Sequence, residues 1–331
     1  MTNRIARFAG ATGSAIALAA LTIAGTAACG TDDADSGRIS VVTSTNVWGD
    51  IAATVAGPDA EVTALISDPA ADPHSFEVTA VQAAALADAD LVVFNGGHYD
   101  AFIDKALGGK DKPAVEAVAV AEQTRAAEAM TTGDHPHDDH SDDHGEEPGG
   151  HGHGGDHDHG NEHVFYDIHV AGAVAERIAE ELGELDPERA AAYAERAAGF
   201  VASLGAVEAI VAPVAAERPG QPVLQTEPLA SYLVLAAGAE DRTPGEFQEA
   251  IEQGTDPAPA AVAAVRELIA SGQVRALIYN IQTEDKTTED VRAAAEAAGI
   301  PVVEVTETLP DGLDYIQWQT RNAEALAAAL R

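Results

Sequence analysis

The stretch DPERAAAYAERAAGFVASLGAVEAIVAPVAAE (186–217) predicts one unusually long helix. Asp186 and Pro187 suit the N-cap and first positions of a helix. The residues that follow favour helix, and the breakers among them are Gly199, Gly205 and Pro213. We expect a helix over about 186–212 that continues or restarts after the proline. At 1.5 Å per residue it spans about 40 Å, enough to join two lobes as a rigid strut, although an ordinary surface helix shows the same pattern.

Short apolar runs typical of strands alternate with helical segments on both sides of this helix. Before it we expect strands at 38–44, 61–67, 90–95 and 114–120, and helices at 47–57, 79–89, 98–109 and 168–183. After it we expect strands at 222–226, 274–280 and 301–307, and helices at 228–238, 257–271, 287–299 and 314–330. Such alternation is typical of βαβ units on a parallel sheet. The predicted fold is α/β: two βα lobes with mainly parallel sheets, joined by the long rigid helix, with a ligand site in the cleft between them.

The N-terminus has the pattern of an export signal followed by a lipid-attachment site. Arg4 and Arg7 precede an apolar, small-residue run that is too short and too interrupted for a membrane span. The only cysteine, Cys29, follows directly and resembles the modified cysteine of a bacterial lipobox. We therefore expect a signal peptide over 1–28, a lipid on Cys29, a tether over 29–37, and folded parts over 38–185, 186–217 and 218–331.

The composition favours an acidic, exported globular protein. Asp and Glu number 55 against 18 Lys and Arg, which gives a formal net charge of −37. Such a surface repels phosphate backbones, so we expect no nucleic-acid partner, whereas it attracts cations at long range. A single cysteine excludes an internal disulfide. With 46% hydrophobic residues, the 331-residue chain has enough apolar material for two domain cores.

A histidine-rich tract interrupts the first lobe. Between Asp134 and His163 the chain reads DHPHDDHSDDHGEEPGGHGHGGDHDHGNEH and holds nine of the 12 histidines. Imidazole is the commonest nitrogen ligand of transition metals, and a segment so poor in apolar residues cannot bury a core. We therefore expect residues 131–162 to form a disordered loop that collects metal ions, rather than a merely solvated linker. The expected capture residues are His135, His137, His140, His144, His151, His153, His157 and His159.

Four metal-capable side chains fall where an open α/β sheet places its ligand, beyond the carboxyl ends of the strands. His74 lies in the loop after the second predicted strand, Glu227 directly follows a strand of the second lobe, and Glu307 closes another. His163 ends the histidine-rich tract, just ahead of an apolar run. Taken singly, each has an ordinary explanation as a loop or surface residue. Together they predict a divalent cation held by two nitrogens and two carboxylates, two from each lobe.

These positions lie in motifs that resemble a known family. The motifs are DPHSFE (72–77), EHVFYDI (162–168), TEPLASYL (226–233) and VTETLPDG (305–312), with further matching segments at 95–107 and 186–198. Over residues 38–331 the chain resembles the zinc- and manganese-binding receptors of bacterial ABC importers. The resemblance implies two lobes joined by one long helix, and the ligands His74, His163, Glu227 and Glu307. The last stands where the family usually has Asp. His98 is expected to be an exposed loop histidine rather than a fifth ligand.

The identity of the metal is left between two ions. Two imidazoles with two carboxylates suit both Zn(II) and Mn(II), while the imidazole cluster and the resemblance to loop-bearing members favour Zn(II). We expect a monomeric, lipid-anchored receptor on the outer face of the cell membrane that passes the ion to an ABC permease. A surface metal buffer or adhesin is a further alternative. An enzyme is not expected, because there is no HExxH motif and four protein ligands would close the coordination position that a catalytic zinc keeps open.

Overall fold

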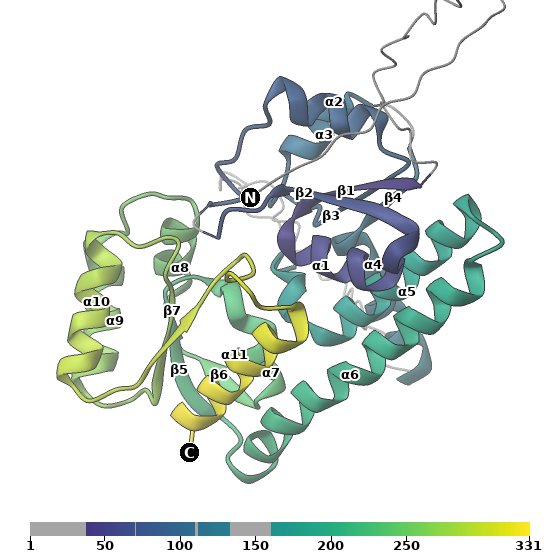
Figure 1. The fold of residues 1–331 in the computed structure, drawn as a ribbon. Helices are drawn as coiled ribbons and strands as arrows, with labels where there is room; N and C mark the ends of the chain where they lie inside the picture. Colours follow the sequence, from purple (N-terminus) through teal and green to yellow (C-terminus); the bar gives the residue numbers. More distant parts are fainter. Residues whose placement is uncertain (1–37, 70, 110–111, 133–159) are drawn as a thin grey trace, which may run out of the picture. The chain divides into compact units, whose positions relative to one another are not determined.

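Two four-stranded parallel sheets, one in each half of the chain, frame the computed structural model (Figure 1). It describes residues 38–69, 71–109, 112–132 and 160–331, so the predicted signal peptide, Cys29, the tether and the eight expected capture histidines lie outside the described residues. The strand order is β2-β1-β3-β4 in the first sheet and β6-β5-β7-β8 in the second. Every strand pair is parallel. Both lobes therefore have the same winding, and the two-lobed α/β prediction is confirmed.

The first lobe alternates strands with helices. Strand β3 is buried over its whole length, as expected for a parallel strand in a sheet covered by helices on both faces. Helix α2 begins at a capping box, in which the side chains of Thr79 and Gln82 each accept a bond from the other's backbone N–H. The elements are β1 (Ile39–Thr45), α1 (Asn46–Ala56), η1 (Gly57–Asp59), β2 (Ala60–Ile66), α2 (Ala80–Asp88), β3 (Leu91–Phe94), α3 (Phe102–Leu107), β4 (Ala114–Glu116), α4 (Ala117–Thr132), η2 (Val164–Tyr166) and α5 (Ile168–Leu185).

The second lobe repeats the arrangement. Strand β7, ALIYN, is buried at every position and lies between β5 and β8. Helices α10 and α11 begin at capping boxes formed by Asp285 with Thr288 and by Asp314 with Gln317. The elements are β5 (Gln221–Gln225), η3 (Pro228–Ala230), α7 (Ser231–Ala236), β6 (Ala239–Asp241), α8 (Gly245–Glu252), α9 (Pro259–Ala270), β7 (Ala276–Asn280), α10 (Lys286–Ala297), β8 (Val302–Val305) and α11 (Tyr315–Ala329).

Helix α6 (Ala190–Glu217) connects the lobes and continues through Pro213 without restarting. It packs against α1 and α5 of the first lobe and against α7 and α11 of the second (Figure 1). Its start corrects the sequence-based expectation: Asp186 ends α5, and Pro187 opens the turn that leads into α6. By length and composition α6 is apolar enough to cross a bilayer. Its buried residues, however, belong to a hydrophobic core that both lobes share.

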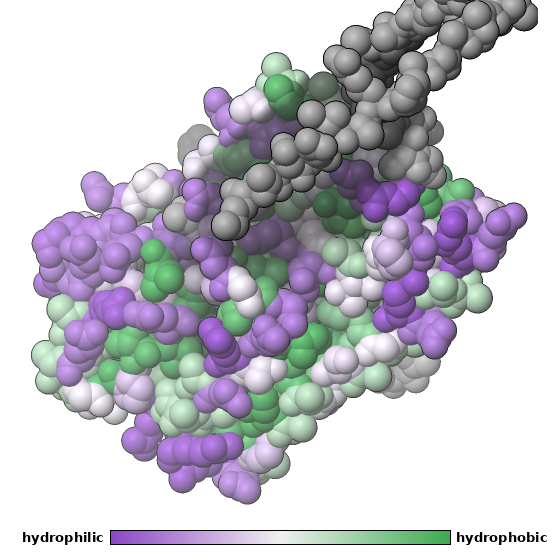
Figure 2. Space-filling view, in the orientation of Figure 1, coloured by the Kyte–Doolittle hydropathy of each residue, from purple (hydrophilic) through white to green (hydrophobic). Residues whose placement is uncertain are grey.

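This shared core is built around aromatic rings from both halves of the chain. The ring of Phe165 stacks on that of Trp318 with centroids 6.3 Å apart, and Trp48 meets Phe165 edge-on at 6.4 Å. Smaller cores lie between the first sheet and α2 and α3, and between the second sheet and α8, α9 and α10. Burial of the apolar surface in the shared core therefore holds the lobes together. On the face shown in Figure 2, hydrophilic residues gather over α9 and α10 and near the junction of α5 and α6.

Local structure departs from the sequence-based expectations in three places. The segment 114–120 is a strand only as far as Glu116 and then enters α4, because Ala117 and Ala121 bury one face of a helix, one turn apart. Since α4 extends to Thr132, the expected loop 131–162 starts inside a helix. The sequence-based expectations contain neither strand β6 nor helix α8. Strand β6 is a three-residue edge strand without an apolar pattern, and α8 is a helix of only eight residues.

Candidate metal centre

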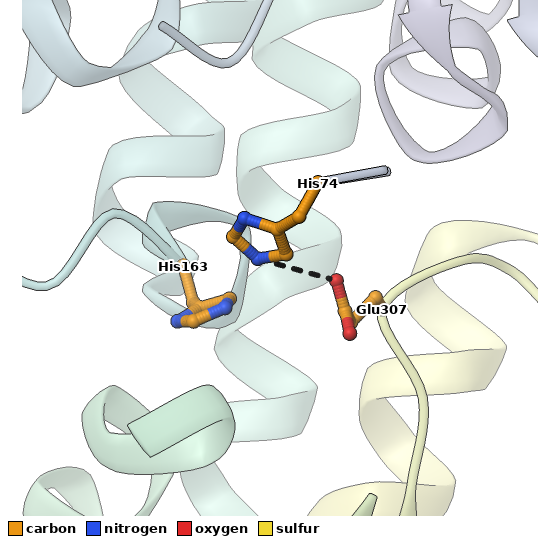
Figure 3. A group of neighbouring side chains, drawn as sticks. All are labelled: His74, His163 and Glu307. Atoms are coloured by element: carbon orange, nitrogen blue, oxygen red, sulfur yellow. Dashed lines mark ion pairs between the residues drawn. The ribbon is translucent and has the colours of Figure 1, made fainter. Parts of the chain in front are cut away.

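His74, His163 and Glu307 lie together between the lobes, and His74 also lines the cleft that opens there (Figure 3). Each offers one ligand atom, and the three atoms lie within 4.8 Å of one another. His74 Nε2 is 3.8 Å from Glu307 Oε2, and the two imidazole rings have centroids 5.9 Å apart. His163 and Glu307 are fully buried, whereas the side chain of His74 is 21% exposed at the mouth of the cleft. Three of the four predicted ligands therefore converge.

Three loops bring these side chains together. The His74 loop follows β2, and Asp72 fixes its turn by accepting a 2.9 Å hydrogen bond from the His74 backbone N–H. His163 directly precedes η2. Glu307 follows β8, and its backbone N–H donates to Gln282 Oε1. The carboxyl end of the second sheet thus supplies an anion, while the first lobe supplies both imidazoles.

Glu227, the fourth predicted ligand, lies beside this cluster rather than in it. It is buried at the end of β5, and its ligand atoms are not among those within 4.8 Å of one another. The Asn280 side-chain amide donates to Glu227 Oε1 and also to Glu307 Oε1, the latter at 2.8 Å. The hydroxyl of Thr283 donates to the same Glu227 oxygen at 2.9 Å. One amide group therefore joins the fourth predicted ligand to the cluster.

The three converging atoms have no hydrogen-bond partner among the described residues. His74 Nε2, His163 Nε2 and Glu307 Oε2 are all buried atoms of this kind. Folded proteins rarely leave buried polar atoms unpaired, because each one costs about 1–3 kcal/mol of desolvation. Two nitrogen lone pairs and one carboxylate oxygen aimed at one point match the preferences of a divalent transition metal. The residues present therefore fit a metal ion as their ligand.

The hydrogen bonds around His163 determine which of its nitrogens is free. The Asn161 side-chain oxygen lies 2.8 Å from His163 Nδ1 and also accepts the His163 backbone N–H at 2.9 Å. The amide orientation of Asn161 is fixed, since its Nδ2 donates to the Pro228 carbonyl in the other lobe. Because an amide oxygen only accepts, Nδ1 must carry the proton, which leaves the Nε2 lone pair facing the cluster.

Burial sets the protonation states expected of a metal site. It lowers the pKa of His163 to about 3, helped by nearby His74, so the imidazole is neutral at pH 7. Its 3.9 Å approach to Glu252 is therefore not an ion pair. Burial also raises the pKa of Glu227 to about 7. It raises the pKa of Glu307 well above its ordinary range, with Glu227 and Asp72 adding to the effect. Buried anions of this kind become favourable when a cation joins them.

The cleft opens to solvent through an acidic mouth with a volume of about 810 Å³. Its wall includes His74, and its carboxylates are Asp72, Glu162, Glu249 and Glu252. Burial, followed by the charges of Glu162 and Glu227, raises the pKa of Glu252 to about 7. His98 lines the same mouth, is exposed, and donates its backbone N–H to Glu162 at 2.7 Å. Carboxylates that line one cleft concentrate cations there.

Several positioning residues escape a search for metal ligands alone. Asn161 and Asn280 are amides, and Gln282 donates to the carbonyls of Pro69 and Ala71 across the cleft at 2.9 and 3.1 Å. In the first lobe, Asn95 donates to the Glu162 carbonyl at 2.8 Å, next to His163. Asn280 is the last residue of a predicted strand. A search for amide side chains at the carboxyl ends of strands, in addition to metal ligands, could therefore have found it.

Fold and site together define a class of architecture: two α/β lobes joined by a long helix, with a candidate metal-ion site between them. Solved structures support the fold. The periplasmic zinc-binding protein TroA from Treponema pallidum has a TM-score of 0.66 at 19% identity, covering 89% of this chain and 99% of that one. The laminin-binding protein of Streptococcus agalactiae, described as having adhesin and metal-transporting activity, has 0.66 at 21% identity, covering 88% and 100%. FpvC of Pseudomonas aeruginosa, solved with Mn2+, has 0.65 at 20% identity, covering 88% and 98%.

A family model described as "Zinc-uptake complex component A periplasmic" (ZnuA) matches residues 41–329. The chain therefore belongs to the ZnuA family of periplasmic, metal-binding receptors. Members of this family are solute-binding proteins rather than enzymes, in agreement with the sequence-based expectation.

Proposed function

We propose that this chain is an extracytoplasmic receptor that binds Zn(II) in the cleft and delivers it to an ABC permease. His74, His163, Glu227 and Glu307 are the proposed ligands. The observation that carries the proposal is the convergence of two imidazole nitrogens and a carboxylate oxygen, all buried and all without a hydrogen-bond partner in the part of the chain that the structure describes. Family membership supports metal uptake as the purpose of this site. Mn(II) is the alternative cargo, because an oxygen-rich set with two carboxylates also suits it.

Capture would begin at the acidic mouth of the cleft. The carboxylates there and the histidine-rich tract raise the local concentration of cations, and His74 is the ligand at the mouth. His163 is already neutral, so its Nε2 can bind without first losing a proton. Glu227 and Glu307 must ionise, so binding releases protons near neutral pH and weakens as the pH falls. Protonation of the carboxylates therefore opposes loading and favours release.

The N-terminal sequence supports attachment at the membrane. We propose that residues 1–28 direct export and that Cys29 carries the lipid, with 29–37 as a tether to the folded part. A monomer anchored in this way would meet its permease by diffusion in the plane of the membrane. The histidines between 135 and 159 are proposed to collect metal ahead of the cleft.

Calorimetry on matched single variants tests the proposed site. In a chain whose eight tract histidines are changed to Asn, His74→Ala and His163→Ala should each lower zinc affinity by at least about a hundredfold, since even losing a partner of a ligand costs 10–100-fold. His169→Ala is the matched control, because it removes an exposed imidazole on α5 away from the ligand cluster. If the cleft variants bind zinc as tightly as the control, the cleft is not the zinc site.

A further inference from the structure

We infer that Asn280 is a specificity-determining residue: its amide bonds one oxygen of Glu227 and one of Glu307, so that the other oxygen of each carboxylate is the one most available to a bound ion. This restricts the site to a low coordination number, which favours Zn(II) over Mn(II). The inference rests on the proposed function, because it concerns the selectivity of the same cleft.

Asn280 is held where its amide can reach both glutamates. It is the last residue of β7, is 1% exposed, and its backbone N–H donates to Thr226 Oγ1 at 3.1 Å on the neighbouring loop after β5. Its side-chain oxygen accepts the backbone N–H of Gln282 at 2.9 Å. That bond fixes the orientation of the amide, so the NH₂ group, and not the oxygen, faces the carboxylates.

The two hydrogens of this NH₂ group fall on one oxygen of each glutamate. One donates to Glu307 Oε1 at 2.8 Å and the other to Glu227 Oε1. Thr283 adds a second bond to the same Glu227 oxygen. In Glu307 the other oxygen, Oε2, is buried, has no hydrogen-bond partner within the described ranges, and lies 3.8 Å from His74 Nε2. The amide therefore separates a structural oxygen from a ligand oxygen.

Zn(II) and Mn(II) prefer different coordination numbers, so this arrangement favours one of them. Zinc sites are usually tetrahedral, so two imidazoles and two single carboxylate oxygens complete the shell. Manganese favours octahedral, oxygen-rich shells, which this residue set approaches only if a carboxylate binds through both oxygens. Glu227 Oε1 already accepts bonds from both Asn280 and Thr283, so binding through both oxygens of Glu227 would break a buried hydrogen bond. Manganese binding therefore loses this hydrogen bond, whereas zinc binding through single oxygens keeps it.

Replacement of Asn280 by Leu tests the inference, because leucine keeps the approximate volume and removes the donor. The ratio of zinc to manganese affinity, measured by chelator competition on the full-length mature chain, should fall about tenfold or more. Cobalt(II) serves as the spectroscopic probe: its intense tetrahedral visible bands in the parent chain should weaken as the coordination number rises. Asn322→Leu, at a buried asparagine whose amide bonds Tyr166 instead, is the control. Asn280→Ala repeats the test if the leucine variant does not fold.

A His163→Ala chain separates failure of this inference from failure of the proposed function. In this variant the cleft has lost a proposed ligand, so the metal that still binds is assigned to the histidine-rich tract. That amount is subtracted from the metal bound by each of the other chains. If the parent chain and His163→Ala bind zinc equally, the proposed function fails. If they differ but the Asn280 variants keep the parent's affinity ratio and cobalt spectrum, only the selectivity role is overturned. An equal loss of both metals also overturns it, since that is the effect of a merely structural residue.

Discussion

Glu227 and Glu307 are two buried acids that follow β5 and β8, the strands on either side of β7, and a single amide bridges them. Water would stabilise their charges far better than this site does, so burial raises the pKa of both carboxyl groups. A ligand set that is costly to ionise alone and favourable with a cation links metal loading to pH. The same residues therefore affect both stability and affinity.

Glu227→Gln should stabilise the metal-free protein at alkaline pH. The pKa of Glu227 is about 7 when folded, against an ordinary 4.5. Between these values the folded chain keeps a proton that the unfolded chain has lost, so stability from this group is full at low pH and is lost as pH rises through 7. The variant cannot ionise and should exceed the parent's free energy of unfolding by roughly 1–3 kcal/mol at pH 8, with little difference at pH 4. Urea titrations with a chelator at both pH values measure this.

The comparison between the two chains reports on Glu227 together with Glu307, because the charge of Glu227 is one cause of the raised pKa of Glu307. His163 has its pKa lowered to about 3 and contributes equally to both chains, so its effect cancels. Glu324→Gln, at an exposed position on α11, should show no such pH-dependent gain. A stability difference that stays constant between pH 4 and 8 would mean that Glu227 is already ionised in the folded protein.

At the scale of elements, the sequence predicts best where burial imposes a simple pattern. The strands β1, β2, β3, β5, β7 and β8 are apolar runs, and the long helix is visible because 28 residues favour helix with few breakers. The Ala-Val alternation after Glu116 fits a strand and a helix equally well. It becomes helix only because Ala117 and Ala121 pack on one face, which is a tertiary effect.

The candidate site is predictable to a similar depth. Strand ends and motifs locate His74, His163 and Glu307, which the structure brings together, and Glu227, which lies one amide away. What the sequence does not reveal is which oxygen of each carboxylate is already bonded, because that depends on Asn280 and its own partner Gln282. Nor does it reveal that α8 brings Glu252 to within 3.9 Å of His163. Both depend on how separate elements pack.

At the scale of the whole molecule, the proposed lipid anchor makes a simple prediction. Changing Cys29 to Ser removes the only thiol in the chain, and therefore the proposed attachment point. A single diacyl anchor provides strong membrane affinity, since each buried methylene contributes about 0.8 kcal/mol. The variant should move from the membrane fraction to the soluble fraction, while its folded part binds zinc as before. Equal membrane retention of both chains would contradict the anchor, and a Thr31→Ser variant controls for expression.

The histidine-rich tract and the cleft should differ in how many ions they hold and how tightly. The cleft offers one set of converging ligands, so we expect one tight zinc per chain there. If the eight tract histidines collect metal as proposed, they add further and weaker binding to that of the cleft. Changing all eight to Asn should therefore lower the zinc content of chains purified without added metal toward one ion. Elemental analysis measures this, with His163→Ala as the converse variant that keeps only weak sites. An unchanged zinc content in the Asn variant would mean that the tract is a solvated linker, and capture would then depend on the acidic mouth of the cleft alone.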